Sequence, residues 1–171
     1  MYVCSFMYVR SFMHVGSFMH VCSFMSACWY ISETQYFEFD NLNGEKKYKG
    51  FDAYKKSKLA NVMFTYELAK RVEKKGITAN CLHPGFVATK FGNYNNILWR
   101  SFISFAKLLM AINVKDGAKT SVHLACSDEV KDITGRFFAD CKVKQGSSKA
   151  KNDEHNKKLW ELSEKLVAPF V

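Results

Sequence analysis

Two residues with useful chemistry, Tyr54 and Lys58, lie four positions apart in this chain of 171 residues. Residues four apart share one face of a helix, so in a helix the Lys58 ammonium can lie beside the Tyr54 hydroxyl. A phenol with an ordinary pKa of about 10 is a poor acid or base at neutral pH, but a nearby cation favours the phenolate. The pair therefore indicates a general acid/base, although this spacing also occurs often by chance and needs support from its surroundings.

The segments around the pair have the patterns of a helix and a following strand. The buried face of the helix is predicted from apolar residues at helical spacing: Leu59, Val62, Met63, Tyr66 and Ala69. Asp52 is the expected N-cap, and Gly76 is the glycine expected to end the helix. Residues 77–82 predict a short buried strand.

The remaining segments predict further alternation of helix and strand. Residues 116–126 predict a helix in which Gly117 and Ala118 allow close packing, and residues 135–140 predict a strand. Residues 153–166 predict a last helix, with an inward stripe formed by Leu159, Leu162 and Leu166. A strongly apolar helix is expected from Leu98 to Ile112, either covering an apolar substrate or lying in the core or on a membrane surface.

Residues 1–30 are five near-copies of a hexad, from Met1 to Tyr30. The even period suits strand alternation with both faces partly apolar, and no turn residues interrupt the run, so the segment is prone to aggregation. We interpret residues 1–30 as a low-complexity repeat outside the fold of the rest, residues 31–171. The repeat could supply one or two strands to a sheet. Its His14 and His20 have no third ligand at a fixed spacing, so we predict no metal site.

Composition excludes several classes of protein. The net charge of +9 comes mostly from lysines that fall on the polar faces of expected helices, and no nucleic-acid-binding motif accompanies them. Six cysteines form no C-x-x-C pair, which favours a reducing compartment, cytoplasmic or at the cytoplasmic face of a membrane. No run of about 18 apolar residues is present.

The surroundings of Tyr54 resemble a known family. The motifs that carry the resemblance are Tyr54 with Ser57-Lys58-Leu59-Ala60-Asn61, and Leu82-His83-Pro84-Gly85-Phe86-Val87-Ala88-Thr89. They resemble the short-chain dehydrogenase/reductases, and residues 40–45 are most similar to the retinol-dehydrogenase-like branch. The resemblance covers about residues 36–168. It implies an α/β fold, a Rossmann-type parallel-sheet domain of which this chain holds the C-terminal part, truncated at its N-terminal half.

The resemblance also implies a site. Tyr54 would be the general acid/base, and Lys58 would lower its pKa and bind the cofactor ribose. At the strand end, Pro84 and Gly85 would let the backbone approach the cofactor, Val87 would meet the nicotinamide carboxamide, and Thr89 would meet phosphate or amide. The implied cofactor is NADP or NAD, and the implied substrate is a bulky apolar alcohol, aldehyde or ketone.

Two parts of the family's machinery are missing from this sequence. None of the nine glycines forms the phosphate-binding cluster of a dinucleotide fold. The position of the family's catalytic serine falls near Cys28 and Trp29, with Ser32 close by as a substitute. We therefore expect an oxidoreductase by descent that is inactive as this fragment.

Two other hypotheses are open. In the first hypothesis, the chain is a non-catalytic interaction fragment. It pairs with an intact homologue or a membrane surface, as a homo- or hetero-oligomer, through its half-sheet or residues 98–112. Alternatively, the hexads are a translated nucleotide repeat or a wrongly predicted exon.

Overall fold

The computed structural model of this chain describes residues 12–15, 18–24, 37–42, 44–85 and 113–170. In chain order, the strands and α-helices are β1 (Phe12–Val15), β2 (Phe18–Phe24), α3 (Gly50–Val72), β3 (Ile77–His83), α5 (Val114–Cys126), β4 (Phe137–Ala139), β5 (Lys142–Lys144) and α6 (Asp153–Val167). Short 3-10 helices lie at Phe39–Asn41, Glu73–Lys75, Asp128–Val130, Ser148–Lys151 and Ala168–Phe170.

The five described strands form one sheet in the order β1-β2-β3-β4-β5. The three central strands are parallel, while β1 and β5 pair antiparallel with their neighbours. In β2, Val21 lies between Phe12 of β1 and Ala79 of β3. The prediction that the hexad repeat could supply strands is confirmed, since β1 and β2 both come from it. The division of the chain at residue 30 stays a prediction.

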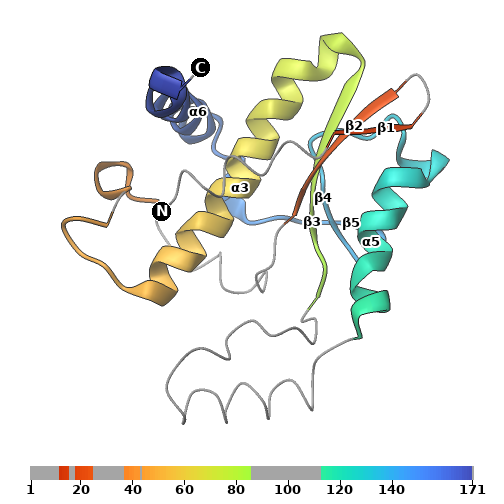
Figure 1. Cartoon of the computed structure of the whole chain (residues 1–171), viewed down its shortest axis with the longest axis horizontal. Helices are drawn as coiled ribbons and strands as arrows, with labels where there is room; N and C mark the ends of the chain where they lie inside the picture. The colour runs from red at the N-terminus through yellow and green to blue at the C-terminus, as the bar shows by residue number, and fades with distance from the viewer. Residues whose placement is uncertain (1–11, 16–17, 25–36, 43, 86–112, 171) are drawn as a thin grey trace.

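The helices cover both faces of the sheet, with α3 and α6 on one face and α5 on the other (Figure 1). Alternation along β3 serves the two layers, because Cys81 packs in the cluster of α3 and the next residue, Leu82, packs in the cluster of α5. In β4, Phe137 and Phe138 divide in the same way. The predicted α/β class is confirmed.

The predicted inner face of α3 is correct: Leu59, Val62, Met63 and Ala69 are buried, and Tyr66 is half-buried against them. The helix ends as predicted, because Gly76 follows the last turn with φ of 67°, a left-handed conformation that glycine adopts without strain.

The prediction that Asp52 caps α3 is wrong. The helix begins at Gly50, and its N-cap residue, Lys49, makes no side-chain cap bond. Asp52 lies inside the first turn and forms an ion pair with Lys55 at 2.7 Å. A carboxylate there still suits the positive end of the helix dipole, so the residue type was informative and its position was not.

The other two helices have asparagine caps that the sequence patterns did not reveal. The Asn113 side chain accepts from the Asp116 N–H at 2.8 Å, so α5 begins two residues before its predicted start. Asn152 accepts from the His155 N–H at 3.0 Å and begins α6 where predicted. Of the expected packing pair in α5, Gly117 is buried and Ala118 is exposed.

The predicted inward stripe of α6 is only partly correct. Leu159 is 2% exposed, but Leu166 is 44% exposed. Leu162 lies between them, half-buried, and only Leu159 of the three belongs to the buried cluster with α3. Leu166 is corrected from a core residue to a surface residue.

The strand predicted over residues 135–140 is shorter than expected, and β5 was not predicted. Asp140 and Cys141 join β4 to β5 with φ of 54° and 58°. Two successive positive φ values are typical of a tight hairpin turn whose twist matches the strands. The Cys141 N–H donates to Thr120 Oγ1 at 3.1 Å, which ties this turn to α5.

Candidate active site

Tyr54 and Lys58 lie on successive turns near the start of α3, both half-buried. The Lys58 Nζ lies 5.3 Å from the centroid of the Tyr54 ring, over its face. The helix begins early enough to hold both residues because it starts at Gly50, and the Ser57 hydroxyl donates to the Tyr54 carbonyl oxygen at 2.7 Å. The structure therefore brings the predicted cation and phenol together.

Lys58 differs from the two lysines before it. Lys55 and Lys56 form ion pairs with Asp52 and Glu38, at 2.7 and 2.6 Å. In the part of the chain that the structure describes, no carboxylate lies within ion-pair distance of Lys58, and burial lowers the pKa of its ammonium. A cation that is desolvated and unneutralised acts strongly on a neighbouring phenol or on a bound polar group.

The end of β3 supplies the second part of the site. Because α3 and β3 run in opposite directions and pack together, the start of α3 and the carboxyl end of β3 lie at the same end of the molecule (Figure 1). Pro84 and Gly85 follow β3 there, and Gly85 has φ of 82°. In α/β sheets, ligands bind beyond the carboxyl ends of the strands.

Several predicted site residues lie outside the described residues. Val87 and Thr89 are among them, as are Ser32 and the predicted serine position at Cys28 and Trp29. The apolar segment 98–112 lies outside as well. Their roles stay predictions.

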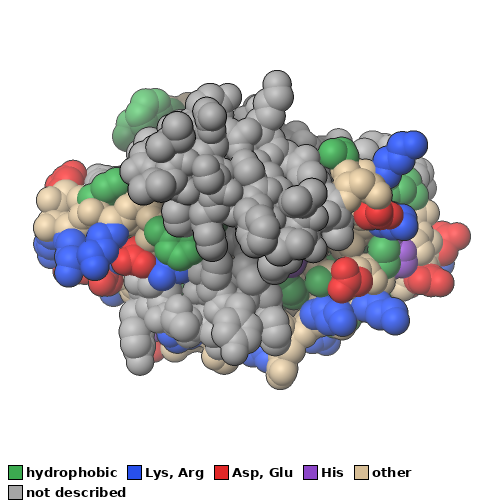
Figure 2. Space-filling model, turned by 90° about the horizontal axis from the view of Figure 1, so that it is seen from below, with side chains coloured by type: hydrophobic (Ala, Val, Ile, Leu, Met, Phe, Trp, Pro, Cys, Tyr) green, Lys and Arg blue, Asp and Glu red, His purple; other side chains and the backbone are tan. Residues whose placement is uncertain are grey.

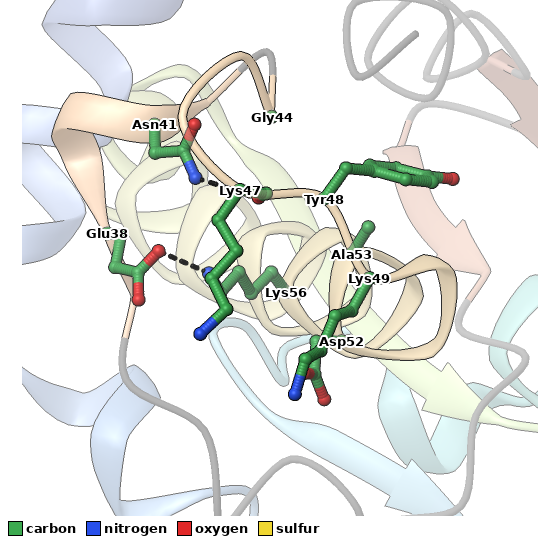
Figure 3. Close-up of a pocket in the computed structure, with 9 residues that line it drawn as sticks. All are labelled: Glu38, Asn41, Gly44, Lys47, Tyr48, Lys49, Asp52, Ala53 and Lys56. Atoms are coloured by element: carbon green, nitrogen blue, oxygen red, sulfur yellow. Dashed lines mark hydrogen bonds and ion pairs between the residues drawn. The ribbon is translucent and has the colours of Figure 1, made fainter.

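A polar pocket of about 220 Å³ lies beside the start of α3 (Figure 3). Its lining residues are Glu38, Asn41, Gly44, Lys47, Tyr48, Lys49, Asp52, Ala53 and Lys56, so it includes neither Tyr54 nor Lys58. Two interactions close one wall: the Glu38–Lys56 ion pair, and the bond from the Asn41 side-chain amide to the Lys47 carbonyl oxygen at 3.1 Å. The sequence patterns did not predict this pocket; the signal present is three lysines within four residues, Lys46, Lys47 and Lys49.

The surface and the remaining described residues add three observations. On the face shown in Figure 2, Lys and Arg side chains lie among Asp and Glu side chains at both flanks. Within the described residues there is no cluster of three or more metal-ligating side chains. Among the helices of the described residues, none is long and apolar enough to span a membrane.

Comparisons with known proteins show what this chain is similar to. A family model described as short chain dehydrogenase matches residues 41–97. Retinol dehydrogenase 14 of Mus musculus is 40% identical over 131 residues, which are 75% of this chain and 39% of the relative. Retinol dehydrogenase 13 of Homo sapiens is 35% identical over 144 residues, which are 80% of this chain and 44% of the relative. The chain thus spans about two fifths of the length of these curated relatives.

A solved structure supports the fold alone. The crystal structure of an uncharacterized protein from Mycobacterium paratuberculosis has a TM-score of 0.62 and 24% sequence identity, and the match covers 87% of this chain and 50% of the other. The family model and the retinol dehydrogenases match this sequence, and the fold is α/β. This chain therefore belongs to the short-chain dehydrogenase/reductase family, in its retinol-dehydrogenase-like branch.

Proposed function

We propose that this chain is, by descent, an NADP(H)- or NAD(H)-dependent oxidoreductase for a bulky apolar alcohol, aldehyde or ketone. The observation that supports this most is the half-buried Tyr54 and Lys58 pair at the same end of the α3–β3 unit as Gly85. The retinol dehydrogenases among its relatives support an alcohol or carbonyl substrate.

The residues present suit one half of a dinucleotide. Lys58 offers an ammonium for the ribose, and Gly85, in a left-handed conformation, lets backbone come close to a flat ring. The 171 residues contain no glycine cluster for the pyrophosphate. When bound, the cofactor supplies or accepts the hydride.

Tyr54 performs the proton transfer in this proposal. In the reducing direction, its hydroxyl donates a proton to the substrate oxygen as hydride reaches the carbonyl carbon, and in the oxidising direction the phenolate takes the proton back. Lys58 stabilises the phenolate through its charge. If no serine stands at the position near Cys28 and Trp29, the developing alkoxide lacks one donor, and loss of one such donor costs on the order of 10²–10³ in rate in other enzymes.

We further propose that the chain alone is inactive. The test is an assay of NADPH oxidation by the purified 171 residues with an aromatic or retinoid aldehyde. No turnover above background is expected. Sustained turnover that Tyr54→Phe abolishes would overturn this proposal and show that the chain alone is an active oxidoreductase.

Cofactor binding is tested separately, through the fluorescence of Trp29, Trp99 and Trp160 during titration with NADPH and NADH. Saturation at micromolar cofactor would show a rebuilt phosphate site. Absence of binding at millimolar cofactor, in a chain shown by circular dichroism to be folded, would mean that Tyr54 and Lys58 are inherited residues that catalyse no reaction in this chain.

A second function is favoured by two exposed aromatic residues beside the site. Tyr48 and Phe51 are 60% and 56% exposed. A non-catalytic fragment that pairs with an intact homologue would bury them, and a concentration-dependent mass in sedimentation, lost in Phe51→Ser, is the result expected. A reducing, cytoplasmic or membrane-facing location belongs to the same proposal.

A further inference from the structure

A second and larger hollow lies at the other end of α3. It has a volume of about 710 Å³ and lies between the last turns of α3, the start of β4, and β5 with the chain that follows it. Tyr66, which lines it, is twelve residues beyond Tyr54, or about 18 Å along the helix at the usual rise. This groove is therefore separate from the candidate active site.

Positive charge dominates the groove. Four cations line it, Lys70, Arg136, Lys144 and Lys151, against two carboxylates, Glu73 and Asp153. Lys70 and Asp153 neutralise each other at 2.5 Å. In the described part of the chain, the other three cations have no carboxylate within ion-pair distance, so the groove attracts anions.

The side chain of Tyr66 also lines the groove. Tyr66 is half-buried, and its hydroxyl lies close against Gly146, where a Cβ would displace it. Burial, with a smaller effect of the Cys81 thiol, raises the pKa of Tyr66, and Arg136 offsets part of this rise. The hydroxyl stays protonated at neutral pH and can donate, and among the described residues it has no hydrogen-bond partner.

Apolar atoms complete the lining. They come from α3, as the methyl group of Ala69 and the ring of Tyr66. The volume falls in the range of pockets that hold small molecules. We propose that this groove binds a small organic anion, with a phosphate or carboxylate held by Arg136, Lys144 and the Tyr66 hydroxyl, and an apolar part against the Tyr66 ring and Ala69.

The test is an NMR titration of the isotope-labelled 171-residue chain with phenyl phosphate, benzoate and benzyl alcohol. Phenyl phosphate or benzoate should shift the amide signals of residues 134–137 and 143–146 with saturation, and benzyl alcohol, which lacks the charge, should not. Tighter binding of one anion identifies the head group as phosphate or carboxylate.

Variants assign the contacts. In the double variant Arg136→Gln/Lys144→Gln, binding should weaken about tenfold or more, because two charge-assisted contacts are lost. The matched control Lys131→Gln/Lys142→Gln removes the same charge from exposed lysines outside the groove and should change binding less than about twofold. Tyr66→Phe should weaken binding severalfold without loss of the circular dichroism signal.

Three results would overturn the proposal. They are equal weakening in both double variants, signal shifts that map away from the groove, and no saturable shift with either anion at about 10 mM. Equal weakening in both double variants would mean that the anions bind only through the general positive charge of the chain. Since none of these readouts depends on NADPH, they are independent of the outcome for the candidate active site.

Discussion

At the scale of one residue, the buried ammonium of Lys58 lowers the free energy of unfolding. Its ammonium is desolvated on α3, and burial lowers its pKa from the ordinary 10.5. Between the folded and unfolded pKa values, the unfolded chain binds more protons, so the free energy of unfolding rises with pH there. The penalty is complete below the folded pKa and disappears above 10.5.

We therefore expect Lys58→Met to be more stable than the natural chain in urea denaturation at pH 7, with a gap that narrows toward pH 10.5. Lys56→Met is the matched control, since it breaks the ion pair with Glu38 and should lower stability slightly. A gap for Lys58→Met that is constant with pH would contradict the desolvation argument.

Cys141 carries strain that a glycine would remove. Its φ of 58° lies in the left-handed region, which disfavours residues with a Cβ. Cys141→Gly should raise the free energy of unfolding by about 1 kcal/mol while keeping the N–H bond to Thr120. The control Ala118→Gly, at an exposed position inside α5, should lower it by about 1 kcal/mol. If thermal unfolding shows that both variants lower the free energy of unfolding, the turn is unstrained.

At the scale of an element, α6 offers two leucines on one predicted stripe with different surroundings. Leu159 is 2% exposed and packs with Leu59 and Val62, whereas Leu166 is 44% exposed. Leu159→Ala should cost about 2–5 kcal/mol in urea denaturation, because it leaves a cavity. Leu166→Ala, the same change on the same helix, should cost less than about 1 kcal/mol. Similar costs for both would mean that the helix packs along its whole length.

At the scale of the whole molecule, the hexad strands complete the sheet. β2 lies between β1 and β3, with Val21 paired on both sides. A parallel strand such as β3 is normally covered on both edges and both faces, and β2 supplies the missing neighbour. A sheet that depends on a low-complexity repeat is an unusual feature of this chain.

Proline in β2 tests that dependence. Val21→Pro removes a backbone donor from the middle of the sheet and should lower the free energy of unfolding by at least about 2 kcal/mol. Val114→Pro is the control, because the first position of α5 is exposed and tolerates proline, with an expected change below about 0.5 kcal/mol. An unchanged urea midpoint in Val21→Pro would show that β3 is stable without β2.

Local patterns predicted much of the fold. The inner face of α3, the glycine at its end, β3 and the start of α6 all depend on spacing within a few residues, and all are confirmed. The errors have other causes. Asp52 has the right type for a cap but lies one turn too far in, and Leu166 repeats a stripe beyond the point where α6 has a partner.

By itself, the sequence determined the α/β class, the pairing of Tyr54 with Lys58 and the family, because helical periodicity and short motifs need no knowledge of distant contacts. Only the tertiary structure decided the burial of Lys58 without a carboxylate partner in the described part, the place of the repeat strands beside β3, and the cationic groove around Tyr66. These features join residues that are far apart in the chain. Their energies come from desolvation and packing, which depend on what surrounds a residue in space rather than on its neighbours in sequence.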